Sequence, residues 1–476
     1  MRRTTYDRRL AGCLILAALC GAIVSGFGTP LIPEVARVHD VSLEAAQWAL
    51  TVTLVVGAVT TPVVSRIGDG RRRRRVLVLS LAAVALGGLV AAAVGTFPGL
   101  LAGRALQGLG YGLIPLTIGV AREYLEGKVL RRTLALLSIS IAVGAGLANP
   151  MTGLFVHYLD YRAAFLFGAV LTAVAAILSA RVVPLSTRAP ARLGVDVPGA
   201  LLLGGGLGAG LLAISRGAAW GWASATILGL FAISTVLLAA WAMVELRAAT
   251  PLVDLRLACS PALLGVNLTA LGTGAAVFGG MSLVYRVVQA PASAPGGLGQ
   301  SLLVAGLLML PMSAGSLLAP SLTRRLSCVV SLRIVLVIGS ALVAAAYLFF
   351  ARLHEELWQI TVVTFVAGIG IGVTYSVMPA VIVARTPPAR TASAMGVNTV
   401  LRITGGAIGS ALIAAVQAAW TPRGEDFPAE SGYVVAALLA AGLCGIAALI
   451  SVTLVVDKLA IVRGCASWTT ASRPTT

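Results

Sequence analysis

Residues 98–120, PGLLAGRALQGLGYGLIPLTIGV, carry no charged side chain other than Arg104. At a rise of about 1.5 Å per residue, a helix of this length crosses the roughly 30 Å hydrocarbon core of a bilayer. An arginine within such a helix is energetically costly, and an intramembrane charge is by default a functional residue. The stretch therefore predicts a transmembrane helix whose one charge, Arg104, serves the protein's activity.

The rest of the chain is likewise rich in hydrophobic residues and poor in charged ones. It has 476 residues, of which 58% are hydrophobic and 11% are charged, whereas a soluble domain carries about 25% charged residues. This composition excludes a soluble enzyme, a disordered protein and a nucleic-acid binder. An all-α integral membrane protein with fourteen transmembrane helices is predicted from the charge-poor runs 10–33, 46–65, 76–96, 98–120, 133–156, 162–183, 198–215, 223–245, 260–285, 298–320, 332–351, 357–380, 391–420 and 433–456.

The basic residues test this count independently. With the N-terminus in the cytoplasm, 27 of the 35 lysines and arginines fall in inner segments, 6 fall in outer loops, and Arg104 and Arg402 lie within spans. Cytoplasmic loops carry such an excess of basic residues. We therefore expect a multi-pass protein of the plasma or inner cell membrane, with both termini in the cytoplasm.

An internal repeat predicts the architecture. Gly108-Leu-Gly110-Tyr-Gly112 returns as Gly368-Ile-Gly370-Ile-Gly372, and each is followed by an Ala-Arg pair and a basic, threonine-containing turn. Glycines are also common in packed membrane helices, which is the competing interpretation. The repeat predicts two six-helix pseudo-symmetric bundles plus two inserted helices, divided as 1–184, 185–256 (the insertion), 257–460 and a cytoplasmic tail, 461–476. Two such halves around a central site are a transporter plan.

The loop after the second span reads Ser65-Arg-Ile-Gly-Asp69-Gly-Arg-Arg-Arg73-Arg74-Arg-Val-Leu77. It resembles the loop motif of the major facilitator superfamily at Asp69, Arg73, Arg74 and Leu77, although Ser65 and Arg72 replace both motif glycines. The resemblance implies that Asp69, Arg73 and Arg74 form a cytoplasmic gate.

Two further helices resemble the same family. Leu100 to Gly110 matches its arginine motif, which implies a part for Arg104 in proton transfer, and Gln107 lies on the same helix face. A snorkelling arginine is the alternative. The run Gly144 to Gly153 resembles the antiporter motif, which implies close packing and a kink. The packing and kink candidates are Gly108, Gly110, Gly146, Pro150 and Gly153.

Gln47-Trp48, the inserted helix pair and the run Asn398-Thr-Val-Leu-Arg402 resemble the fourteen-helix drug:proton antiporter branch. The resemblance implies a central cavity, for which the candidate side chains are Gln47, Trp48, Gln107, Asn149, Asn398 and Arg402. Arg402 lies twelve residues past Arg390, about 18 Å along a helix. It could bind an anionic substrate or hydrogen-bond backbone and amide groups as a structural element.

One departure concerns the proton site. The branch carries an aspartate in its first helix, and Val24 stands at that place. None of the seventeen acidic residues falls in the middle third of a predicted span. Glu34, Asp69 and Arg104 are therefore the proton-coupling candidates, and coupling stays open.

The sequence predicts a secondary active transporter, not an enzyme: a proton-coupled exporter of small amphipathic organic compounds, with the proton gradient as energy source and no cofactor. The alternatives are an uncoupled or differently coupled carrier of a neutral or anionic metabolite and, remotely, an integral-membrane enzyme. No phosphate-binding loop occurs and the three histidines fall in outer loops, so neither ATP nor a metal site is expected. The expected partners are a small molecule and the bilayer, with the protein as a monomer.

Overall fold

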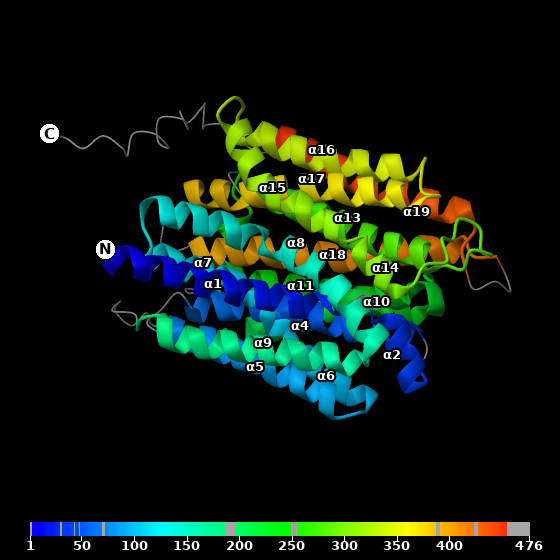
Figure 1. Cartoon of the computed structure of the whole chain (residues 1–476), viewed down its shortest axis with the longest axis horizontal. Helices are drawn as coiled ribbons and strands as arrows, with labels where there is room; N and C mark the ends of the chain where they lie inside the picture. Colours follow the sequence, from blue (N-terminus) through cyan, green and yellow to red (C-terminus); the bar gives the residue numbers. More distant parts are fainter. Residues whose placement is uncertain are drawn as a thin grey trace.

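A computed structural model gives the arrangement of the helices (Figure 1). It describes the chain except for residues 1, 29–30, 42, 47, 69–71, 186–195, 249–250, 252, 254, 262, 387–390, 423–426 and 455–476. The described residues form α-helices and one 3-10 helix, and no strand. The predicted all-α class is confirmed for this part of the chain. The predicted tail, 461–476, lies outside it.

Eleven helices of the described part are long and apolar enough to cross a membrane. The other three predicted spans, 98–120, 133–156 and 198–215, are also helical. The first of them is broken into α6 (Phe97–Gln107), the 3-10 turn η1 (Gly108–Gly112) and α7 (Leu113–Tyr124). The glycine-rich sequence of η1 explains the break, because glycine weakens an α-helix.

The N-terminal helices pack together as one half, in which α1 contacts α8 and α9, and α5 contacts α9 and α6. Besides α6, η1 and α7, this half comprises α1 (Arg2–Gly26), α2 (Ile32–His39), α3 (Leu43–Ala46), α4 (Trp48–Gly68), α5 (Arg73–Ala93), α8 (Gly127–Tyr158) and α9 (Tyr161–Val182).

The C-terminal helices form a second half, in which α13 packs on α18 and α19, and α17 packs on α15 and α16. Two of them begin at a serine whose hydroxyl accepts a hydrogen bond from the first turn, Ser301 for α14 and Ser331 for α16. The half comprises α13 (Leu264–Gln289), α14 (Leu302–Leu307), α15 (Leu310–Ser327), α16 (Leu332–Phe350), α17 (Leu357–Arg385), α18 (Thr391–Ala419) and α19 (Glu430–Leu454).

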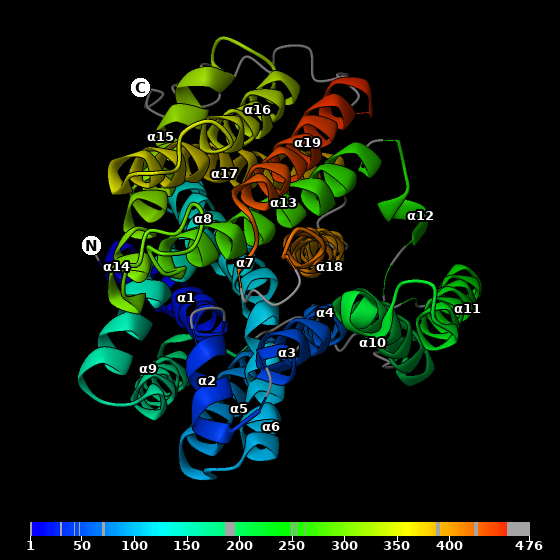
Figure 2. The same ribbon diagram turned by 90° about the vertical axis from the view of Figure 1, so that its right-hand side faces the viewer.

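Between the halves in sequence come α10 (Val197–Trp220), α11 (Ala225–Arg247) and the short α12 (Leu255–Ala258). Helix α10 packs against α4 and α18, one from each half, whereas α11 packs mainly on α10. In Figure 2 the pair lies at the side of the bundle, with α11 outermost. The insertion therefore flanks one contact between the halves and leaves the centre to the other helices.

The halves meet along two seams. One joins α4 to α18, and the other joins α8 to α14 and α15. The helices run roughly parallel, so the bundle has two ends: the N-terminal end and the opposite end, which carries α2 (Figure 1). We call the latter the α2 end.

The first predicted span differs from the structure at its end. The run 10–33 suggested one helix through Pro33, but α1 ends at Gly26 and a separate helix, α2, begins at Ile32. Proline is favoured in the first turn of a helix, where its missing N–H costs nothing. Pro33 therefore starts a new helix instead of continuing the first one, and it carries Glu34 away from α1.

Candidate functional site

A small cavity of about 30 Å³ lies where the two halves face each other. Its lining is mostly apolar, with three polar side chains, Ser25, Tyr111 and Asn149. Helices α1, α4, α7, α8 and α13 and the turn η1 supply the walls, through Gly21, Ala22, Ser25, Gly26, Leu50, Gly110, Tyr111, Ile114, Asn149, Phe278 and Met281. A cavity lined from both halves is where a molecule passing between them would be held.

Asn149 is the polar side chain of α8 at this cavity. It is buried, and neither its amide oxygen nor its amide nitrogen has a hydrogen-bond partner among the described residues. An unsatisfied buried amide costs about 1–3 kcal/mol, so it needs an explanation. A ligand that completes these hydrogen bonds would supply one.

Arg402 lies on α18 with its guanidinium 4.5 Å from the centroid of the Tyr375 ring on α17. The residue is 7% exposed, and no hydrogen bond joins its guanidinium to a described residue. Val400 and Ile403, on either side of it in α18, pack in one cluster with Tyr111, which lines the cavity from the other half. The Tyr375 hydroxyl is likewise buried without a partner in the described part.

Two other predicted cavity residues are engaged in packing. The Asn398 amide nitrogen donates to Oδ1 of Asn267 at 3.2 Å and to the Val266 carbonyl at 3.4 Å, which ties α18 to α13. Gln107 accepts a hydrogen bond from Arg104 at 2.7 Å. Trp48 begins α4, and Gln47 lies outside the described residues.

Arg104 is fully buried, and its charge is met by backbone oxygens instead of a carboxylate. Nε donates to the carbonyl of Ala49 and Nη1 to the carbonyl of Val24, each at 3.1 Å. The guanidinium also lies 5.8 Å from the Phe165 ring centroid. An arginine buried in this way does not snorkel towards the membrane surface, which was the alternative interpretation of the sequence.

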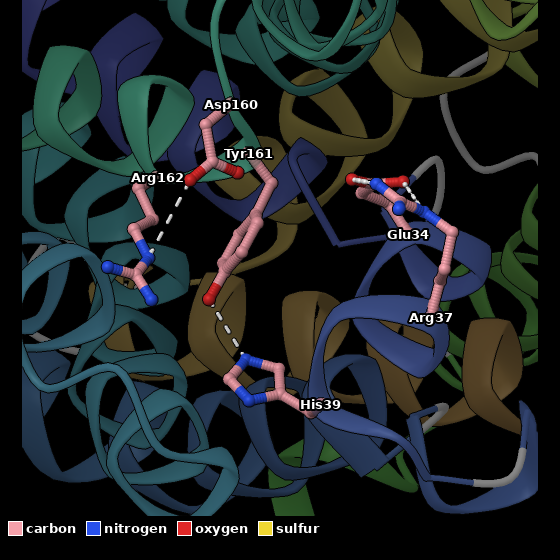
Figure 3. Close-up of polar contacts among 6 residues, drawn as sticks. All are labelled: Glu34, Arg37, His39, Asp160, Tyr161 and Arg162. Carbon is pink, nitrogen blue, oxygen red and sulfur yellow. Dashed lines mark hydrogen bonds and ion pairs between the residues drawn. The ribbon is translucent and has the colours of Figure 1, made fainter.

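Glu34 does not contact Arg104. It forms an ion pair with Arg37, one turn further along α2, with an Nη2–Oε1 distance of 2.6 Å (Figure 3). This hydrogen bond and the charge of Glu34 raise the pKa of Arg37 above its ordinary value. Glu34 therefore lies in a polar cluster at the α2 end and not at the central cavity.

The same cluster holds His39, whose Nε2 lies 2.9 Å from the Tyr161 hydroxyl (Figure 3). Asp160 and Arg162 form a looser pair beside it, at 3.7 Å. Burial and, to a smaller degree, the charge of Arg162 lower the pKa of His39 below its ordinary value. The contact joins α2 to the start of α9.

At the N-terminal end, Arg73 is buried between α4 and α7. Its Nη1 donates to Oε2 of Glu123 at 2.7 Å and to the Gly119 carbonyl at 2.6 Å, and its Nε donates to the Gly68 carbonyl. Arg74 donates to the Ala180 carbonyl of α9. These contacts of Arg73 and Arg74 are within their own half, and Asp69 lies outside the described residues.

Three glycines lie on the seam of α8 with α14 and α15. A Cβ on Gly153 would lie 2.8 Å from the Cα of Leu303, and one on Gly306 would lie 2.7 Å from the Asn149 carbonyl oxygen. A Cβ on Gly146 would collide with Ser313. Helix α8 continues through Pro150. The backbones of the two halves thus touch near the α2 end.

Gly108 and Gly110 provide close contacts inside the first half. A Cβ on Gly108 would lie 2.8 Å from the Thr53 carbonyl oxygen of α4, and one on Gly110 would lie 3.4 Å from the Gly21 carbonyl oxygen of α1. The turn η1 is therefore held against α1 and α4, two of the helices that line the cavity.

Sequence reasoning missed Glu123, Tyr111 and Tyr375 as members of these sites. Glu123 had a usable signal, because it is an acid at a helix end on the side where the loop arginines gather. Tyr111 lies in the first copy of the glycine repeat, and Tyr375 lies three residues after the second copy. The repeat therefore pointed to their neighbourhood but not to their closeness to Arg402.

Comparisons of the sequence with family models and with known proteins point to the same family. A family model described as the Major Facilitator Superfamily matches residues 14–410. An uncharacterised MFS-type transporter of Mycobacterium tuberculosis is 28% identical over 85% of this chain, and the chain spans 59% of that relative's length.

Two relatives are covered almost in full. A puromycin resistance protein of Streptomyces alboniger is 27% identical over 93% of this chain and 90% of its own length. A cephamycin export protein of Amycolatopsis lactamdurans is 26% identical over 90% of this chain and 88% of its own length. The crystal structure of a human organic anion transporter superposes with a TM-score of 0.61 at 17% identity, over 94% of this chain and 99% of that one, a likeness of fold alone.

Proposed function

The chain belongs to the major facilitator superfamily, and from that premise we propose that it is a secondary active transporter that exports small amphipathic organic molecules, driven by a proton gradient. The relatives covered nearly in full are named for puromycin resistance and cephamycin export, which supports export of organic compounds. The family relationship also favours transport over the remote alternative of an integral-membrane enzyme.

The observation that carries the proposal is the cavity shared by both halves. It holds about 30 Å³, whereas a site for a drug-sized molecule needs about 300–1,000 Å³. The cavity must therefore enlarge before it accepts such a molecule, and the halves must separate to allow this. Rocking of two halves around a fixed central site is the physical basis of alternating access.

The membrane arrangement is part of the proposal. We assign fourteen spans, with both termini in the cytoplasm and the α2 end outside, because 27 of 35 basic residues then fall in inner segments. Single cysteines replacing Arg74 and Trp222, in a background without the native cysteines, test the assignment. Only the cysteine at position 222 should react with an impermeant thiol reagent in intact cells. Reaction at position 74 would overturn the orientation.

Transport by the purified protein in lipid vesicles tests the function. We expect accumulation of members of a chemically varied panel, including puromycin and a cephamycin, when a pH gradient is imposed, and only equilibration without it. Protein-free vesicles give the background. Gradient-independent transport would favour the alternative, an uncoupled or differently coupled carrier. Absence of any transport across the panel would overturn the proposal.

That alternative has one observation in its favour. The described acidic residues lie near helix ends or in connections, and the buried Arg104 donates hydrogen bonds to carbonyl oxygens and an amide instead of an acid. A proton site at the centre of the membrane is therefore not evident in the described residues. Asp69, outside them, stays a candidate for coupling.

A further inference from the structure

Arg402 differs from Arg104, the other arginine inside a predicted span, in how many of its hydrogen-bond donors are used. A guanidinium offers five N–H donors. Arg104 uses Nε and Nη1 on two carbonyls and Gln107 and leaves Nη2 buried without a partner among the described residues, whereas no hydrogen bond joins Arg402 to the described part of the chain. The Tyr375 ring at 4.5 Å covers one face of its guanidinium but leaves the N–H groups at its edge unused.

A buried cation without a counter-charge is unstable, because burial removes its hydration. The ion pairs among the described side chains join Arg37 to Glu34, Arg73 to Glu123 and Arg162 to Asp160. None of them involves Arg402. An anion from outside the protein would supply the missing charge and accept the unused hydrogen bonds.

Further polar groups without partners lie beside Arg402 and at the central cavity. Tyr375 contributes a buried hydroxyl from the second half, and Asn149 contributes a buried amide from the first half. Tyr111 connects the two places, since it packs in one cluster with Val400 and Ile403, on either side of Arg402 in α18, and lines the cavity together with Asn149. These side chains offer an anion hydrogen-bond donors from both halves.

The other side chains of the cavity wall indicate the chemical character of the rest of the ligand. Leu50, Ile114, Phe278 and Met281 are apolar, which suits a hydrophobic body. A planar carboxylate can accept two parallel N–H hydrogen bonds from a guanidinium. We infer that the central site binds amphipathic organic acids, with the carboxylate held by Arg402 and the apolar body between the halves.

This inference rests on the proposed function for its biological meaning, but it is tested by binding alone. Detergent-purified protein is heated with a panel of aromatic and alkyl carboxylates, each matched with its own neutral amide, and the melting temperature is measured. We expect some carboxylates to stabilise the wild type more than their amides do. Arg402→Gln should erase that difference, and Arg352→Gln, which removes an exposed charge from the same half, should preserve it.

Arg402→Lys keeps the charge but loses the planar pair of donors, so its apparent Kd for a preferred carboxylate should rise at least about tenfold. This variant also keeps the inference testable if Arg402→Gln fails to fold. A wild type that prefers no carboxylate over its amide would overturn the inference. So would a preference that survives Arg402→Gln, or an unchanged Kd in Arg402→Lys.

The two proposals fail separately. Carboxylate binding that depends on Arg402, in a protein that transports nothing, would refute the transport proposal alone. Transport of neutral compounds without any carboxylate preference would refute the organic-acid site alone.

Discussion

Nη1 of Arg104 donates a hydrogen bond of 3.1 Å to the backbone carbonyl oxygen of Val24. Val24 occupies the place at which the resembled antiporter branch carries an aspartate. The arginine is thus met at this position by a main-chain dipole instead of a carboxylate. The consequence is a buried charge that is held in place without a titratable partner among the described residues.

Arg104→Lys should destabilise the protein, because a lysine cannot reach the oxygens of Val24, Ala49 and Gln107 together. Each hydrogen bond to a charged group contributes about 1.5–3 kcal/mol. We expect a clear fall in the melting temperature of the detergent-purified variant. Arg352→Lys, at an exposed position, is the matched control and should melt like the wild type. Equal melting of the two variants would refute this account of Arg104.

Val24→Asp should be tolerated only when Arg104 is present. Val24 is buried in the apolar cluster that includes Phe27 and Phe165, where an unpaired carboxylate is costly. In a double-mutant cycle with Arg104→Gln, scored by melting temperature, we expect coupling of at least about 1 kcal/mol. Additive effects would mean that a side chain at position 24 cannot reach the guanidinium.

Gly306→Ala should weaken the closure of the halves at the α2 end. The added Cβ would lie 2.7 Å from the Asn149 carbonyl oxygen and 2.9 Å from its carbonyl carbon, and backbone atoms cannot give way as a flexible side chain can. A cysteine replacing Met281, which lines the cavity, should then react faster with an impermeant thiol reagent added outside.

Gly442→Ala is the control for this seam, since a Cβ there would meet nothing within 4 Å. It should leave the labelling rate of the same cysteine unchanged. If Gly306→Ala does not accelerate labelling, the seam does not limit access to the cavity.

His39 should make the packing of α2 against α9 sensitive to acid. Its pKa is lowered in the folded protein by burial and by Arg162, so the folded state holds its proton less tightly than the unfolded chain does. The stability that depends on neutral His39 is full above the unfolded pKa of about 6.5 and is lost as the pH falls towards the folded pKa. Melting temperatures measured from pH about 7.5 down to about 5.5 should show this loss.

His39→Gln can keep a hydrogen bond to the Tyr161 hydroxyl but cannot become charged, so its melting temperature should fall less over the same pH range. His157→Gln changes an exposed histidine at the same end and should follow the wild type. A wild-type pH dependence that His39→Gln retains in full would assign the effect to other groups.

Most of the fold could be predicted from the hydropathy and charge of the sequence. Membrane helices are selected by the length of their apolar runs, so the ranges predicted for α5, α9, α11 and α19 differ from the structure by only a few residues. The prediction failed at Pro33, where hydropathy continues although the backbone starts a new helix. A span is recognised by composition, but its ends depend on local backbone geometry.

The candidate site was harder to predict from the sequence than the fold. Arg104, Asn149 and Arg402 were visible because a charge or an amide stands out in an apolar run. Their partners were not visible, because the carbonyl of Val24 has no side-chain signature and Tyr375 lies on a different helix from Arg402. Glu34 was a proton-coupling candidate because it follows the first predicted span in sequence, but it lies in α2 and pairs with Arg37.

The central claim is that the two halves open alternately around the cavity, and paired spin labels measure this most directly. One pair, at Tyr158 and Ser301, spans the α8–α14 seam at the α2 end, and a second pair, at Arg132 and Arg325, spans the α8–α15 seam at the N-terminal end. In lipid vesicles, a transported compound or a pH gradient should shift the two distance distributions in opposite directions, one pair lengthening as the other shortens. Distributions that stay unchanged, or lengthen together, under every condition that supports transport would contradict the claim.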